Sequence, residues 1–144
     1  MTPMFVDSHC HLDFPEFRDR LPEVLANMKS SQVSHALCVS VDIPDFPRVL
    51  KLAQENANLY ASVGVHPDYE DTPEPTVEFL VDTALKHSKI IAIGETGLDY
   101  YRMGDRSYES MEWKRDRFRV HIHAAIKSKK PLIIHTRSAS VDTI

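Results

Sequence analysis

Two histidines separated by a single residue lie near the start of the chain, in the segment FVDSHCHLDF at residues 5–14. Side chains two apart in an extended strand share a face, so His9 and His11 would point one way and Cys10 the other. Imidazole nitrogen is a common ligand of zinc and of several other divalent cations. The spacing therefore indicates a bidentate grip on a metal ion or, alternatively, the polar end of a buried strand.

A second pair with the same spacing, His121 and His123, lies in a segment of different periodicity. Apolar residues recur there at helical spacing, and the segment stops at Pro131. Two residues two apart on a helix point in widely different directions. We therefore expect this second pair to be surface or half-buried histidines and not a pair of metal ligands.

Three more polar residues interrupt the ends of apolar runs. His66 follows ASVGV, Glu95 follows IIAIG, and His135 follows PLII. Each would stand at the carboxyl end of a strand, where open α/β sheets and (β/α)₈ barrels carry their sites. Together with the first histidine pair they could converge on one or two cations, with Glu95 bridging through its two oxygens. The alternative is that each is a separately satisfied polar end of a strand.

Apolar runs that favour strands alternate along the chain with amphipathic stretches that favour helices. Strands are expected over residues 4–9, 33–41, 59–67, 89–99 and 131–137. Helices are expected over residues 20–32, 44–57, 75–88 and 107–130, with a last one beginning near Ser138. This alternation predicts a parallel sheet covered by helices, in one domain or part of one.

Composition limits the environment of the chain. Its 144 residues are 42% hydrophobic and 26% charged, as in a globular protein of single-domain size. No apolar run approaches the roughly 20 residues needed to cross a bilayer, and the first ten residues lack the pattern of a signal peptide. We therefore expect a cytoplasmic protein with no membrane partner. Cys10 and Cys38 are too few for a disulfide framework and are expected to be buried thiols.

The charge is unevenly distributed. A net charge of −4 argues against a broad basic surface for nucleic acid. Residues 102–130 nevertheless carry nine Lys or Arg against four Asp or Glu. This run could be a local track for phosphates, but the solvated face of an amphipathic helix is the favoured interpretation.

Four segments resemble successive signature blocks of the TatD family of metal-dependent hydrolases, deoxyribonuclease-like members of the amidohydrolase superfamily with a (β/α)₈ barrel. They are FVDSHCHLD at 5–13, GVHP at 64–67, IGETGLDYY at 93–101 and PLIIHTR at 131–137. The match is collinear from Phe5 to the end of the chain. Its most specific part is the Gly-Glu-Thr-Gly-Leu-Asp block.

The resemblance implies a site with two divalent cations, such as Mg, Mn or Zn, and DNA as the substrate. His9 and His11 would hold one cation. Glu95 would bridge the two cations and His135 would hold the second, which makes Glu95 and His135 the catalytic residues. Two cations that share a carboxylate can orient the scissile phosphate and activate a water. The groups expected near the substrate are His66, Asp99, Tyr100 and Arg137.

Two glycines, Gly94 and Gly97, bracket Glu95 and Thr96 in the sequence GETG. Because glycine has no Cβ, these positions would let the backbone turn closely beneath a ligand. The same glycines could equally mark an ordinary exit from a strand into a loop, and the spacing leaves both interpretations open.

The chain differs from the resembled family in length. A (β/α)₈ barrel takes roughly 250 residues, whereas about four and a half βα units are expected here. Residues 1–144 are therefore interpreted as the amino-terminal half of a TatD-like hydrolase domain, of class α/β, with a partial TIM (β/α)₈ barrel. The further His and the late Asp of the family are not in this sequence. We expect the chain alone to be a poor catalyst and to self-associate through open sheet edges.

Two other functions are compatible with the sequence. One is an amidohydrolase that acts on a small amide, lactone or ester, which a hydrolysis screen would distinguish from a nuclease. The other is a non-catalytic metal-binding fragment, which metal uptake without turnover would indicate.

Overall fold

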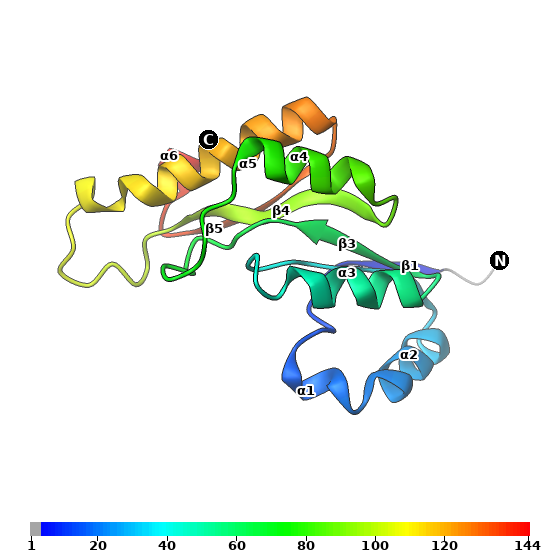
Figure 1. Cartoon of the computed structure of the whole chain (residues 1–144). Coiled ribbons are helices and arrows are strands. Elements are labelled where there is room, and N and C mark those ends of the chain that lie inside the picture. The colour runs from blue at the N-terminus through cyan, green and yellow to red at the C-terminus, as the bar shows by residue number, and fades with distance from the viewer. Residues whose placement is uncertain (1–3) are drawn as a thin grey trace.

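A five-stranded parallel sheet with helices on its outer side forms the centre of the computed structural model, which describes residues 4–144 (Figure 1). The strands are β1 (Phe5–Cys10), β2 (Val33–Cys38), β3 (Leu59–Val63), β4 (Ile90–Asp99) and β5 (Leu132–Arg137). The helices are α1 (Pro15–Arg18), α2 (Leu21–Ser30), α3 (Phe46–Glu55), α4 (Val77–Lys86), the 3₁₀ helix η1 (Glu109–Met111), α5 (Glu112–Ser128) and α6 (Ser140–Thr143). Residues 1–3, which begin the segment considered for a leader, lie outside the described residues.

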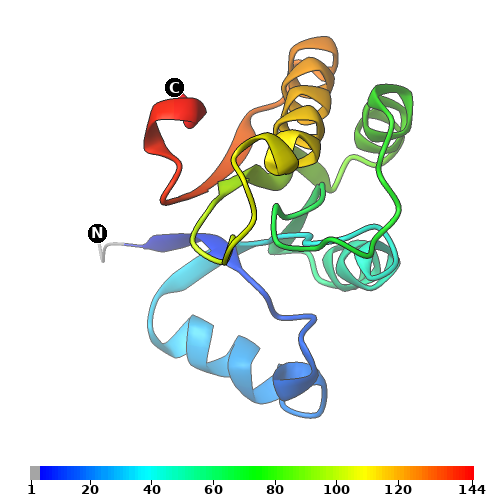
Figure 2. The same ribbon diagram turned by 90° about the vertical axis from the view of Figure 1, so that its left-hand side faces the viewer.

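The strands follow one another in space as they do in sequence. Their order is β1-β2-β3-β4-β5, and each neighbouring pair is parallel. The sheet curls, and the helices surround it as an open ring, with the gap between the first and last strands (Figure 2). The predicted α/β class and partial (β/α)₈ barrel are therefore confirmed.

The observed elements match the expected ones except at a few ends. Helix α1 was not predicted, because four residues are too few to show a helical period. Strand β2 ends at Cys38, three residues before its predicted end. Beyond that point the Val39 N–H still donates to the Cys10 carbonyl at 2.8 Å, but the next N–H, of Ser40, donates to the Ser62 hydroxyl at 3.0 Å. The chain therefore leaves the regular ladder while remaining buried.

The apolar core fills the space between the sheet and its helices. Continuous apolar strands supply one side of it, and the inner stripes of α3 and α4 supply the other. A fully buried Leu, Ile or Val side chain contributes roughly 1.5–3 kcal/mol to the free energy of unfolding. The large apolar side chains with the least exposure include Val49, Leu59, Val63, Leu80, Ile90 and Ile93.

Helix α5 does not present its basic run to solvent as predicted. Lys114, Arg115 and Arg117 are buried, with exposed fractions of 2%, 8% and 3%. The predicted solvated face is wrong at these positions, because each buried head group pairs with a carboxylate on or near the helix. In the same order, the carboxylates belong to Asp68, Glu112 and Glu74.

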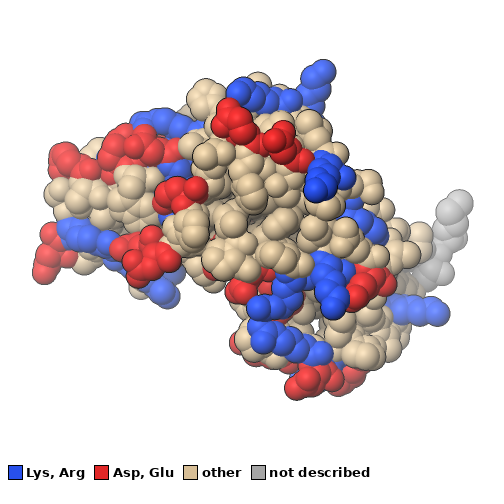
Figure 3. Space-filling model, in the orientation of Figure 1, with Lys and Arg blue, Asp and Glu red and all other residues tan. Residues whose placement is uncertain are grey.

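The surface agrees with the modest net charge. On the face displayed in Figure 3, acidic and basic side chains are interspersed, and the basic groups do not merge into one broad area. Among the described helices, none is both long and apolar enough to cross a membrane.

The open edges of the sheet carry apolar side chains and generate a prediction. Val6 on β1 is 65% exposed and Ile134 on β5 is 50% exposed. Unpaired edge groups can pair with a strand of another chain, and a charged side chain on the edge opposes this. We expect sedimentation velocity to show concentration-dependent association of the 144-residue chain. Val6→Lys and Ile134→Lys should shift it toward the monomer, whereas Ile126→Lys on α5, at a residue that is 69% exposed, should not. A monomer at every concentration would contradict the prediction.

Candidate metal centre

Glu95 on β4 lies among four histidines at the carboxyl end of the sheet, and it is only 7% exposed. Its Oε2 atom lies 3.2 Å from His9 Nε2 and 3.9 Å from His11 Nε2. Its Oε1 atom lies 3.5 Å from His135 Nδ1 and 3.9 Å from His66 Nε2. The convergence predicted from strand polarity is therefore present, and each carboxylate oxygen faces a different histidine pair.

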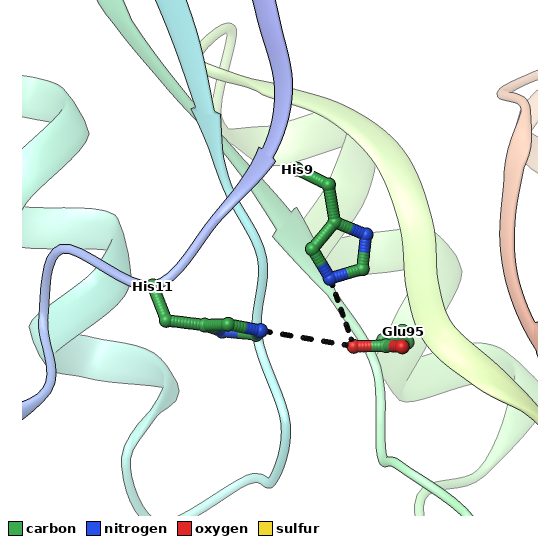
Figure 4. A group of neighbouring side chains, drawn as sticks. All are labelled: His9, His11 and Glu95. Atoms are coloured by element: carbon green, nitrogen blue, oxygen red, sulfur yellow. Dashed lines mark ion pairs between the residues drawn. The ribbon is translucent and has the colours of Figure 1, made fainter.

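His9 and His11 approach the same oxygen of Glu95 from one side (Figure 4). Cys10, between them, faces the other way, and its Sγ lies 3.8 Å from the Sγ of Cys38. The alternation expected of an extended segment is thus confirmed. Cys38 is buried as predicted, whereas Cys10 is only partly buried because it ends the edge strand.

The hydrogen bond made by one ring nitrogen of His11 determines which ring nitrogen carries the proton. His11 Nδ1 lies 3.1 Å from the carbonyl oxygen of Val39. A carbonyl oxygen only accepts hydrogen bonds, so Nδ1–H is the donor and Nε2 keeps its lone pair for the space beside Glu95. Histidines that bind metals typically donate their other ring nitrogen in this way.

His135 has the same arrangement with its two nitrogens exchanged. Its Nε2–H donates to Oδ2 of Asp99 at 2.8 Å, which leaves the Nδ1 lone pair facing Glu95. Burial by itself would raise the pKa of Asp99, but hydrogen bonds from His135 and the Tyr101 N–H outweigh burial and hold the pKa below its usual range. Asp99 is therefore a carboxylate, and the carboxylate–histidine pair is typical of metal centres.

His66 is arranged as a hydrogen-bond donor. The backbone N–H of Asp68 donates to His66 Nδ1 at 3.1 Å. Burial lowers the pKa of His66 despite the nearby Glu95 carboxylate, so the ring is neutral and carries its proton on Nε2. This Nε2–H donates to His135 Nδ1 at 3.2 Å. Although donor atoms of His66, Glu95 and His135 lie within 4.8 Å of one another, His66 has no free lone pair to offer a cation.

The donor set fits a divalent cation on the first side of Glu95. The ligand atoms of His9, His11 and Glu95 lie within 4.8 Å of one another. Two imidazole nitrogens and a carboxylate oxygen are a set that zinc and related cations accept. On the other side, Glu95 and His135 could offer two further ligand atoms, and a positive charge there would offset the burial of the carboxylate.

Two glycines allow β4 to lie close to β5. A Cβ at Gly97 would stand 2.0 Å from the carbonyl oxygen of His135, and one at Gly94 would stand 2.7 Å from that of Ile133. The close approach is to the neighbouring strand, and β4 continues past both glycines to Asp99. The strand therefore does not exit into a loop at these glycines, and their place beneath a ligand stays a prediction. The contact matters because it brings β4 and β5 together where both carry site residues.

Tyr100 and Arg137, predicted near the substrate, lie in different surroundings. The Tyr100 hydroxyl donates to Asp142 at 2.8 Å and accepts from Arg115 at 3.1 Å, so it joins α6 to α5. Arg137 ends β5, and its guanidinium carbon lies 3.6 Å from the centroid of the Tyr101 ring. The substrate roles of Tyr100 and Arg137 remain predictions.

Two buried serines that support Glu95 were not predicted. The Glu95 N–H donates to the Ser40 carbonyl at 2.9 Å. The Ser62 hydroxyl donates to the Gly94 carbonyl at 2.6 Å and accepts from the Ser40 N–H at 3.0 Å. In the sequence, each serine is a polar residue inside an apolar run. A single serine in a strand can also be an isolated hydroxyl of the core, so this signal does not identify a supporting residue.

His121 is fully buried, which corrects the expectation of a surface or half-buried residue. The face of α5 that bears it packs against the sheet, and there its Nε2 accepts from the Val65 N–H at 3.0 Å. Its Nδ1–H donates to the Arg117 carbonyl at 2.8 Å. His123 is exposed, so the two histidines diverge as helical spacing requires and share no ligand.

The fold is that of part of a (β/α)₈ barrel, and the carboxyl end of its sheet carries a candidate metal centre. The model of the family TatD related DNase matches residues 6–144, and the chain belongs to this family. It is 41% identical over 143 residues to an "Uncharacterized metal-dependent hydrolase" of Buchnera aphidicola subsp. Baizongia pistaciae, covering 96% of this chain and 52% of the relative. It is 35% identical to the "Uncharacterized metal-dependent hydrolase YcfH" of Escherichia coli K12, covering 96% of this chain and 51% of the relative.

A solved structure agrees with the sequence comparisons. The TatD homologue YjjV of Escherichia coli K12 superposes with a TM-score of 0.84 at 30% identity, over 96% of this chain and 53% of that one. The chain thus spans about half the length of the relatives that it matches.

Burial of His121 generates a prediction about pH. Burial lowers the pKa of His121 from 6.5 to about 4. Between these values the unfolded chain takes up a proton at this histidine that the folded chain does not. The free energy of unfolding is therefore not reduced by His121 above about pH 6.5. It falls as the pH is lowered toward about 4, by up to about 3 kcal/mol at 1.36 kcal/mol per pKa unit. Urea titrations across this range should show a flatter dependence for His121→Gln, whose amide oxygen can still accept from Val65. Equal slopes would refute the assignment.

The first side of Glu95 generates a prediction about metal affinity. We expect calorimetry to show that the chain binds Zn²⁺ or Mn²⁺ and that His11→Ala weakens the tightest binding. Because His11 contributes a ligand atom, the loss should exceed the roughly 10–100-fold effect of losing an outer partner. His35→Ala, at an exposed histidine on β2, is the control and should bind as the unmodified chain does. Equal affinities for all three chains would show that the cation binds elsewhere.

Proposed function

We propose that this chain supplies the amino-terminal part of the active site of a metal-dependent phosphodiesterase that acts on DNA. The observation that carries the proposal is the position of Glu95, whose two oxygens face different histidine pairs. Divalent cations bound beside such a carboxylate would polarise a phosphate oxygen and lower the pKa of a bound water. Family membership supports this class of reaction, and the sharing of one carboxylate favours two cations over one.

The residues of the chain hold this arrangement before any cation binds. His11 is oriented by the Val39 carbonyl and His135 by the Asp99 carboxylate, and in the metal-free chain Nδ1 of His135 accepts from the Nε2–H of His66. Ligands fixed by outer hydrogen bonds lose little conformational freedom on binding. The hydrogen bond from the Glu95 N–H to the Ser40 carbonyl likewise holds the backbone that carries the carboxylate.

Two positively polarised groups favour a phosphodiester over a neutral substrate. His66 holds its Nε2–H beside Glu95 and His135, and a cation on Nδ1 of His135 would free this N–H to donate to a substrate oxygen. Arg137 is held against the Tyr101 ring at the end of the neighbouring strand. Guanidinium groups suit phosphate because their N–H donors match pairs of phosphate oxygens. We assign both residues to the substrate.

Proton transfer is where we expect this chain to be limited. Within the described residues, the carboxylates that pair with ring nitrogens of these histidines are those of Glu95 and Asp99. Glu95 is placed to bridge cations and Asp99 is engaged by His135, so neither is free to take a proton from water. A positioned acid or base typically contributes about 10² to 10⁴-fold. We therefore propose slow turnover by the 144-residue chain.

The test uses single-stranded DNA and the divalent cations Mg²⁺, Mn²⁺ and Zn²⁺. We expect slow, metal-dependent cleavage and metal-dependent binding of a phosphorothioate oligonucleotide. Both should be lost in Glu95→Gln, because a neutral amide cannot bridge two cations. Glu55→Gln, at an exposed glutamate on α3, should leave both unchanged. Cleavage that persists in Glu95→Gln would contradict the proposal.

Other outcomes of the same assay would favour the alternative functions. Metal-dependent hydrolysis of small esters, lactones or cyclic amides without cleavage of DNA would identify an amidohydrolase of small substrates. Metal uptake with neither turnover nor oligonucleotide binding would identify a non-catalytic metal-binding fragment.

A further inference from the structure

One face of α5 carries three buried polar side chains, those of Lys114, Arg117 and His121. Their spacing of three and four residues places them on one side of the helix. Their exposed fractions are 2%, 3% and 0%. Burying such groups is costly unless each finds a partner. Their partners therefore indicate what this face of the helix holds.

Two of the three side chains hold the main chain that follows β3. His121 accepts from the Val65 N–H at 3.0 Å. One helical turn earlier, Arg117 donates to the carbonyl of His66 at 2.9 Å, and its guanidinium pairs with Glu74. Consecutive residues of the segment that carries His66 are thus fixed by consecutive turns of α5.

Lys114 is the third of these buried side chains, and it contacts residues that follow or end two different strands. Its Nζ donates to the main-chain carbonyl of Asp99 at 2.8 Å and lies 3.3 Å from Oδ1 of Asp68. Asp68 belongs to the segment after β3, and Asp99 is the last residue of β4. An ammonium group has three donors, so a single buried side chain can hold both partners.

Both residues held by Lys114 determine which ring nitrogen of a histidine carries the proton. The Asp68 N–H binds Nδ1 of His66, and the Asp99 carboxylate binds Nε2 of His135. The other pair differs, because His11 is oriented by the Val39 carbonyl. Lys114 therefore serves one half of the centre and not the other.

We propose that Lys114 is a positioning residue for the half of the centre formed by His66 and His135. By holding Asp68 and Asp99 at a fixed separation, it keeps the rings of His66 and His135 in place beside Glu95. Its significance for catalysis rests on the proposed function. The positioning itself is a property of the metal-free chain and is tested there.

The experiment compares two lysine variants by nitrogen NMR of the histidine rings. Lys114→Met keeps an unbranched side chain and removes the ammonium. Lys89→Met is the matched control, because Nζ of Lys89 also donates to main-chain carbonyls, at the opposite end of the sheet. In the unmodified chain we expect His66 protonated on Nε2 and His11 protonated on Nδ1. His66→Gln and His11→Gln assign the two ring signals.

Loss of Lys114 should affect the two halves differently. We expect the His66 ring in Lys114→Met to exchange between its two neutral forms, whereas the His11 ring stays unchanged. Lys89→Met should alter neither ring. In a Zn²⁺ titration, Lys114→Met should weaken the binding that His135→Ala abolishes by about 10–100-fold, as loss of an outer partner typically does. The binding that His11→Ala abolishes should be unaffected.

Each outcome decides the proposal. A folded Lys114→Met chain with unchanged His66 and unchanged Zn²⁺ affinities would overturn it. If Lys114→Met does not melt cooperatively, Asp68→Ala replaces it, because this change removes the side-chain acceptor and leaves the lysine on the Asp99 carbonyl. A fixed His66 ring in that variant would then overturn the proposal. Failure to cleave DNA leaves the ring measurement intact, so the two hypotheses fail separately.

Discussion

The site depends on one physical constraint, the burial of the Glu95 carboxylate. A carboxylate that is 7% exposed has lost most of its water and needs donors or a positive charge in return. Its N–H is bound to Ser40, but its side chain faces imidazoles whose outer nitrogens are occupied elsewhere. His11 directs a lone pair toward it, and the lone pair of His135 on that side accepts from the Nε2–H of His66. Cations between the carboxylate and the imidazoles would supply the positive charge that offsets this burial.

Parallel strand order is what brings the parts of this arrangement together. Carboxyl ends of parallel strands meet at one edge, so residues far apart in sequence become neighbours. Strands β4 and β5 must also approach each other closely where they carry Glu95 and His135. Gly94 and Gly97 remove the Cβ atoms that would collide with the carbonyls of β5. The fold is thus adjusted locally at the strand pair that carries the second side of the centre.

Sequence patterns predicted the strand order and the residues around Glu95 because both follow from short-range rules. Alternation in FVDSHCH assigned His9 and His11 to one face, and strand polarity placed His135 with them. The role of α5 could not be predicted from such rules. A run of Lys and Arg has the same composition whether it is solvated or buried. Only the positions of Asp68 and Glu74, about 40 residues earlier, decide that Lys114 and Arg117 face inward.

The two halves of the centre differ in what holds them. His9 lies on the edge strand, and its side chain is 40% exposed, whereas that of His66 is 15% exposed. The first half therefore rests on β1, whose outer side lacks a neighbouring strand among the described residues. The second half rests on side chains of α5 that are buried and paired. Electrostatic preorganisation requires groups that stay oriented when charge appears. The half built on α5 meets that requirement within this chain, and the half built on β1 meets it only as far as that edge strand is held in place.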